Sequence, residues 1–130
     1  MKDNQHEQLF SELTPAEAAV IEGGLRLTID RIQAIRAGAD PVGADDTYIK
    51  VNGTKIWGDY SMTTGQTRSV NRGYTASGSS AQVQLFDADP WPNGDDRVGH
   101  FTAVNTNGVL TRERVGENGS MYYVYYRGYA

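Results

Sequence analysis

The chain contains 130 residues, enough for one domain with a hydrophobic core and too few for two domains of ordinary size. Hydrophobic residues make up 38% and charged residues 22%, which excludes both a membrane bundle and a disordered acidic tail. No uninterrupted apolar run approaches the roughly 20 residues of a membrane span. The chain has no cysteine, so disulfides, thiolate metal sites and a cysteine nucleophile are excluded as well.

The net charge of −4 is concentrated at the N-terminus. Residues 1–24 carry one base and five acids, whereas residues 25–130 carry 11 bases and 11 acids. A neutral body argues against a nucleic-acid partner, because such affinity comes mainly from neutralising phosphates. The step in charge predicts that the chain has two parts, residues 1–24 and residues 25–130.

The sequence of residues 1–24 predicts a short helix. Thr14 can cap the backbone amide of Glu17, and Pro15 occupies the first helical turn, where no hydrogen-bond donor is lost. The pair Gly23 and Gly24 then ends the helix. A helix this short is marginal alone in water, so we expect it to become ordered only against a partner.

The same residues resemble the double-glycine leader of exported bacterial peptides, which peptidase-containing ABC transporters cleave and secrete. The resemblance implies recognition by such a transporter, cleavage after the second glycine and an extracellular location for residues 25–130. An intracellular protein whose N-terminal helix is never removed is the alternative. The matching positions are Leu13, Thr14, Glu17, Ile21, Gly23 and Gly24.

From Leu25 onward, apolar residues alternate with polar ones and are interrupted by turn residues. The opening run changes phase near Asp30 and Arg31, which predicts a bend or a bulge. Asn52-Gly53 between two alternating segments predicts a hairpin with a type I′ turn. About eight short strands of this kind predict an all-β antiparallel sandwich. The further candidate strands are residues 66–70, 81–87, 98–104, 108–115 and 121–129.

Two loops hold seven of the eleven acids of the body, and all seven are aspartates. Carboxylates on such short side chains suit calcium, which takes six to eight oxygen ligands. An isolated pair of aspartates is more often a solvated turn. The seven are Asp40, Asp45 and Asp46 in the first loop and Asp87, Asp89, Asp95 and Asp96 in the second.

The spacing in these loops resembles the C2 domain, the calcium- and phospholipid-binding β-sandwich. The first loop matches at Asp40, Gly43, Asp46, Tyr48, Ile49, Lys50 and Val51, and the second at Asp87, Asp89, Asp96 and Gly99. The resemblance implies an eight-stranded C2-like fold and a calcium ion as cofactor. The ligands that it implies are Asp40, Asp46, Asp87, Asp89 and one of Asp95 or Asp96.

Trp91 lies between two prolines at the tip of the second acidic loop. There it can enter the headgroup region of an anionic phospholipid membrane, or its ring can fold back over the loop. His100 is the only histidine of the body, and no nucleophile and base carry a catalytic signature, so we expect binding and no enzyme. The alternative function is a bacteriocin-like effector or an adhesion scaffold with a metal-free sandwich.

Overall fold

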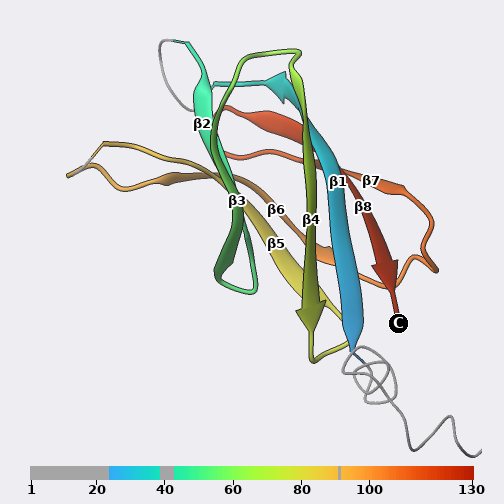
Figure 1. Ribbon diagram of the computed structural model, residues 1–130. Coiled ribbons are helices and arrows are strands. Elements are labelled where there is room, and N and C mark those ends of the chain that lie inside the picture. The colour runs from blue at the N-terminus through green and yellow to red at the C-terminus, as the bar shows by residue number, and fades with distance from the viewer. Residues whose placement is uncertain (1–23, 39–42, 91) are drawn as a thin grey trace, which may run out of the picture.

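The described residues form eight β-strands, and Figure 1 shows how these are arranged in the computed structural model. The structure describes residues 24–38, 43–90 and 92–130. None of these residues forms a helix long and apolar enough to cross a membrane. The strands are β1 (Leu25–Arg36), β2 (Asp45–Val51), β3 (Thr54–Met62), β4 (Thr67–Ala76), β5 (Ala81–Asp87), β6 (Asp96–Ala103), β7 (Thr111–Val115) and β8 (Met121–Tyr129).

The strands form two four-stranded sheets packed face to face. One sheet has the order β4-β1-β8-β7 and the other the order β3-β2-β5-β6, and neighbouring strands are antiparallel throughout. The predicted all-β sandwich of eight antiparallel strands is therefore confirmed. The predicted leader helix falls on residues 1–23, which lie outside the described part of the chain.

Local sequence signals explain several details of the strands. The register of β1 shifts between Ile29 and Arg31, where the change of hydrophobic phase predicts a bend or a bulge. Asn52 and Gly53 have φ angles of 48° and 82°, as a type I′ turn requires. Three strands differ in their bounds from the prediction: β4 covers Thr67–Ala76 instead of 66–70, β6 covers Asp96–Ala103 instead of 98–104, and β7 begins only at Thr111.

The core lies between the two sheets and is made by the inward side chains of every strand. β8 illustrates the alternation, because its residues are alternately buried and half-buried along the whole strand. The largest completely buried side chains include Tyr122, Tyr126, Leu25, Leu27, Ile29, Ile32, Ile49, Met62 and Leu85.

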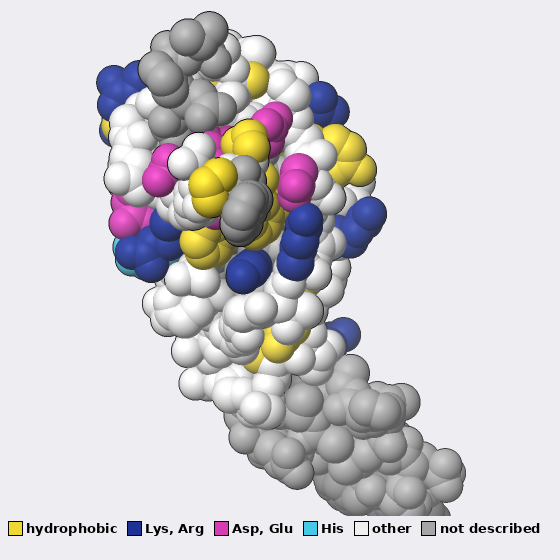
Figure 2. All heavy atoms as spheres, turned by 90° about the vertical axis from the view of Figure 1, so that its left-hand side faces the viewer, with side chains coloured by type: hydrophobic (Ala, Val, Ile, Leu, Met, Phe, Trp, Pro, Cys, Tyr) yellow, Lys and Arg dark blue, Asp and Glu magenta, His cyan; other side chains and the backbone are white. Residues whose placement is uncertain are grey.

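Four connections gather at one end of the sandwich: β1–β2, β3–β4, β5–β6 and β7–β8 (Figure 1). The two acidic loops of the sequence are the first and the third of these connections, so the fold brings them to the same end of the sandwich, which we call the acidic end. Figure 2 shows the side of the molecule from which the β5–β6 connection projects. Acidic and basic side chains there surround a group of hydrophobic ones.

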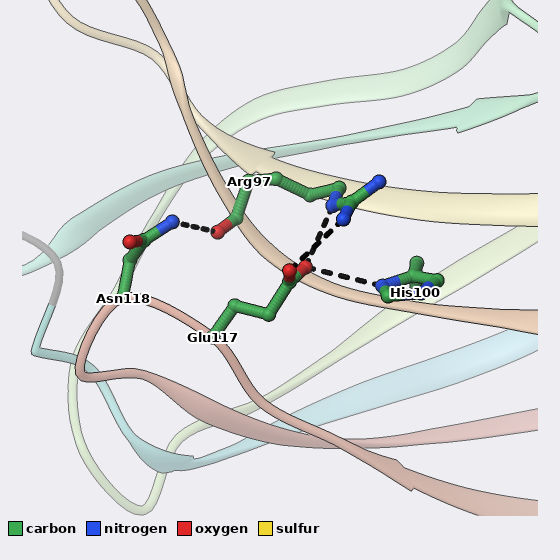
Figure 3. Close-up of polar contacts among 4 residues, drawn as sticks. All are labelled: Arg97, His100, Glu117 and Asn118. Carbon is green, nitrogen blue, oxygen red and sulfur yellow. Dashed lines mark hydrogen bonds and ion pairs between the residues drawn. The ribbon is translucent and has the colours of Figure 1, made fainter.

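A carboxylate on the β7–β8 connection links that connection to β6 (Figure 3). The Arg97 guanidinium donates to both oxygens of Glu117, from Nε at 2.7 Å and from Nη2 at 3.0 Å. His100 Nδ1 lies 3.1 Å from Oε1 of the same carboxylate, and the Asn118 side-chain amide donates to the Arg97 carbonyl. The hydrogen bonds from Arg97, followed by that from His100, hold the pKa of Glu117 below its usual value.

We expect Glu117→Gln to lower the melting temperature at pH 7 by roughly 2–5 °C, the range for a half-exposed ion pair in a domain of this size. Because the folded pKa is lowered, the stabilisation is present above the unfolded pKa, about 4.3, and is lost as the pH falls through the folded value. The difference between parent and variant should therefore shrink toward pH 3. Thermal unfolding followed by circular dichroism between pH 3 and pH 7 measures it.

Glu113→Gln is the matched control, since it makes the same chemical change on β7. This variant should unfold like the parent at every pH. A Glu117→Gln difference that is constant from pH 7 to pH 3 would contradict the role of the carboxylate charge.

Candidate metal centre

Three carboxylates meet where β5 ends and β6 begins. Asp87 is the last residue of β5 and Asp96 the first of β6, and the two are directly paired across the strands. Asp89 follows β5 by two residues. One carboxylate oxygen from each of the three lies within 4.8 Å of the others. Asp87 is buried, and Asp89 and Asp96 are half-buried.

This donor set fits calcium. Calcium–oxygen distances are 2.3–2.6 Å, so two ligands on opposite sides of one ion are separated by about 5 Å at most. The separations among the three carboxylates fall within that limit, and the three groups offer up to six oxygens. All the donors are hard anionic oxygens, which suit calcium better than a transition metal.

The first acidic loop contacts the three grouped carboxylates through the backbone of Asp46. The amide of Asp46 donates to Asp87 Oδ1 at 2.6 Å, and the amide of Ala88 donates to the Asp46 carbonyl at 2.8 Å. The Asp46 side chain is exposed and is not one of the three grouped carboxylates. Two other predicted site residues, Asp40 and Trp91, lie outside the described residues.

Asp95 and Asp96 have different surroundings, although the sequence offers both as the distal ligand. The Tyr48 hydroxyl donates to Asp95 Oδ2, and the Asp89 amide donates to Asp95 Oδ1 at 2.9 Å. These two hydrogen bonds, that from Tyr48 first, lower the pKa of Asp95. Asp95 therefore holds the shape of the β5–β6 connection, whereas Asp96 joins the group with Asp87 and Asp89.

Asp45 has a structural role that the sequence analysis missed. Its carboxylate is completely buried and accepts hydrogen bonds from Ser120 Oγ at 2.7 Å and from the Tyr122 hydroxyl at 2.8 Å. The Tyr122 hydroxyl also lies 2.8 Å from Thr47 Oγ1, and burial raises the pKa of Tyr122. This network ties the start of β2 in one sheet to the start of β8 in the other.

Further hydrogen bonds join the connections to one another. Ser120 Oγ accepts from the Gly38 amide at 3.0 Å, and Thr64 Oγ1 accepts from the Ala37 amide at 3.0 Å. Gly38 and Gly119 approach so closely that a Cβ atom on either would collide with the carbonyl oxygen of the other. Side chains are therefore excluded at this crossing of the two connections.

Two basic side chains lie next to the acidic end, on the outer face of the sheet that contains β2 and β3. Lys50 Nζ lies 5.5 Å from the Phe86 ring centre, and Lys55 Nζ lies 4.8 Å from that of Tyr48. The Tyr48 and Phe86 rings are stacked with their centres 5.2 Å apart. Lys55 also forms an ion pair with Asp59 at 2.6 Å.

At the level of sequence, no family profile and no curated protein matches the chain significantly. Solved C2 domains nevertheless share its fold. One structure of a C2 domain has a TM-score of 0.55 and 16% identity over 82% of this chain and 98% of the other. A C2 domain of plant Extended Synaptotagmin 1 has a TM-score of 0.53 and 13% identity over 82% and 94% of the two chains.

A third similar structure contains two C2 domains of Extended Synaptotagmin 2 with calcium bound. It has a TM-score of 0.51 and 19% identity over 82% of this chain and 45% of the other. At these identities the likeness concerns the fold. The two sheets, their strand order and these neighbours together show that the described part of the chain has a C2-like fold.

Proposed function

We propose that the protein is a calcium-binding module whose ion lies between the β5–β6 connection and the β1–β2 connection. The observation that carries this proposal is the group of Asp87, Asp89 and Asp96, with carboxylate oxygens within 4.8 Å of one another. Asp46 and Asp40 complete the ligand set from the first loop. The calcium-bound Extended Synaptotagmin 2 structure, which has the same fold, supports the choice of ion.

The bound ion would also join the protein to an anionic membrane. A calcium ion held by loop carboxylates keeps coordination positions for lipid phosphate oxygens. Trp91 at the loop tip would enter the headgroup region, where its ring and its indole nitrogen are both accommodated. Lys50 and Lys55 beside the loops add attraction to anionic lipids. The activity is therefore binding, with no catalytic step.

Calcium should stabilise the folded protein. The grouped carboxylates repel one another, and an ion that binds only the folded state relieves that repulsion. At free calcium about 100 times the dissociation constant, the gain is roughly 2.7 kcal/mol, or about 8–15 °C in melting temperature. Magnesium should stabilise much less, because it demands a smaller and more regular ligand shell. Differential scanning fluorimetry with calcium, magnesium and chelator measures the shifts.

Neighbouring aspartates provide the matched comparison. Asp87→Asn and Asp96→Asn should abolish most of the calcium shift, and Asp46→Asn should reduce it. Asp95→Asn should keep the shift, although it removes the carboxylate charge that accepts a hydrogen bond from Tyr48. Asp30→Asn, on β1, should behave like the parent. A melting temperature that does not change in millimolar calcium would contradict the calcium site and would favour the alternative function, a scaffold without a metal.

Membrane association should require calcium and anionic lipid together. With vesicles of phosphatidylserine and phosphatidylcholine plus calcium, tryptophan emission should shift to the blue, and Trp91→Ala should remove most of the shift. Trp57 is 6% exposed in the core and should contribute little. Sedimentation with vesicles that is unchanged by chelator would contradict the bridging ion.

We also propose that residues 1–24 are a double-glycine leader that a peptidase-containing ABC transporter removes during export. The residues that support this are Leu13, Glu17, Ile21 and the Gly23-Gly24 pair, all but Gly24 outside the described residues. The beginning of β1 at Leu25 agrees with a boundary at that point. Gly24 itself is buried in the full chain, so cleavage should precede or accompany folding of the domain.

Processing should occur between Gly24 and Leu25. The intact mass of protein collected outside the cell should correspond to residues 25–130. Replacing Gly24 with a bulky residue should block the cut, because glycines are needed to pass a narrow protease cleft. Extracellular protein that still carries Met1–Gly24 would overturn the proposal, and protein found only inside the cell would favour the uncut alternative.

A further inference from the structure

A groove separates β3 and β4, which are edge strands of different sheets. The two strands follow one another in the chain but belong to separate hydrogen-bonded sheets. The space between them has a volume of about 550 Å³ and is open to solvent. Among the residues that line it are Trp57, Tyr60, Gln66, Arg68, Asn71 and Arg72.

One wall of the groove is aromatic. The Trp57 and Tyr60 rings contact each other with centres 4.7 Å apart and planes tilted by 38°. Trp57 is 6% exposed and is anchored in the core, whereas Tyr60 is 42% exposed. The Arg68 guanidinium lies 5.3 Å from the centre of the Tyr60 ring. A flat group that entered the groove would thus contact aromatic surface and a cation together.

The charge of the groove is positive. Arg68 donates from Nε to the Ser61 carbonyl at 3.0 Å, and Arg72 donates from Nη1 to the Val70 carbonyl at 3.3 Å. Among the described residues, neither guanidinium forms an ion pair, and no acidic residue lines the groove. Each guanidinium has five N–H donors, so most of this donor capacity remains for a ligand.

We propose that this groove binds a small organic phosphate monoester, with its phosphate held by Arg68 and Arg72 and its ring against Trp57 and Tyr60. Two guanidinium groups match the double charge and the several oxygens of a monoester better than they match a single carboxylate. The aromatic wall favours a ligand in which a ring adjoins the phosphate. The site is separate from the three grouped carboxylates and needs no calcium.

Phenyl phosphate is the probe, and the full-length Trp91→Phe protein is the sample, because Trp57 is then the sole tryptophan. In chelator, titration should change Trp57 emission in a saturable way. Inorganic phosphate, which lacks the ring, should bind at least about tenfold more weakly, as expected for about 1.4 kcal/mol of ring contact. Benzyl alcohol, which lacks the phosphate, should give no saturable change.

Arg72 gives the sharpest variants, since its side chain is exposed and its loss leaves the core intact. Arg72→Gln should weaken phenyl phosphate binding about tenfold or more, with an unchanged melting temperature. Arg72→Lys keeps the charge but not the forked N–H donors of the guanidinium, so its affinity for phenyl phosphate should lie between those of the parent and of Arg72→Gln. Arg112→Gln is the control, because Arg112 lies over Tyr123, outside the groove.

Vesicles that contain phosphatidic acid distinguish the source of the phosphate. Vesicles that displace phenyl phosphate would support a lipid headgroup as the ligand, and failure to displace it would support a soluble phosphate ester. The absence of a saturable change up to about 10 mM phenyl phosphate would overturn the site, because it would mean a binding free energy weaker than roughly −3 kcal/mol. Equal losses of phenyl phosphate affinity in Arg72→Gln and Arg112→Gln would also overturn the site. Because no calcium is present, neither result bears on the metal centre.

Discussion

The arrangement of the connections at the acidic end of the molecule depends on the hydrogen bonds that the buried Asp45 carboxylate accepts. This carboxylate accepts hydrogen bonds from Ser120 Oγ, on the β7–β8 connection, and from the Tyr122 hydroxyl, on β8 of the opposite sheet. Ser120 Oγ in turn accepts a hydrogen bond from the Gly38 amide. This chain of hydrogen bonds fixes both described ends of the β1–β2 connection against β8. Removing one donor from a buried polar group costs about 1–3 kcal/mol, so the arrangement of the connections is strongly determined by these few contacts.

Aspartates that look equivalent in the sequence perform three different tasks in the structure. Asp45 is structural, Asp95 receives Tyr48 and shapes its own loop, and only Asp96 joins Asp87 and Asp89. The role of Asp45 could have been predicted, because it shares the inward phase of Thr47, Ile49 and Val51 along β2. The choice of Asp96 over Asp95 could not, because it rests on the register that pairs Asp96 with Asp87 across two strands.

The strands themselves were predictable wherever alternation and turn residues agree, as in β5 and β8, whose predicted and observed bounds coincide. Errors arise where pairing overrides the local pattern. β4 continues past Gly73 because Ala76 pairs with Leu25 at the start of β1. β7 begins late because the amides of Thr106 and Gly108 both donate to the Gly128 carbonyl, which holds that stretch in a turn. Such tertiary contacts leave no trace in local composition.

The electrostatics of the acidic end indicate why a cation from solution suits it. Three basic side chains beside it have partners of their own: Arg97 pairs with Glu117, Lys55 pairs with Asp59, and Lys50 lies over the Phe86 ring. These contacts keep the lysines on the outer sheet face, where they contribute to lowering the pKa of Asp95. The three grouped carboxylates lie at a separation that one divalent ion can span. An acidic centre with cations at its margin is therefore compatible with the proposed binding of calcium and of an anionic surface.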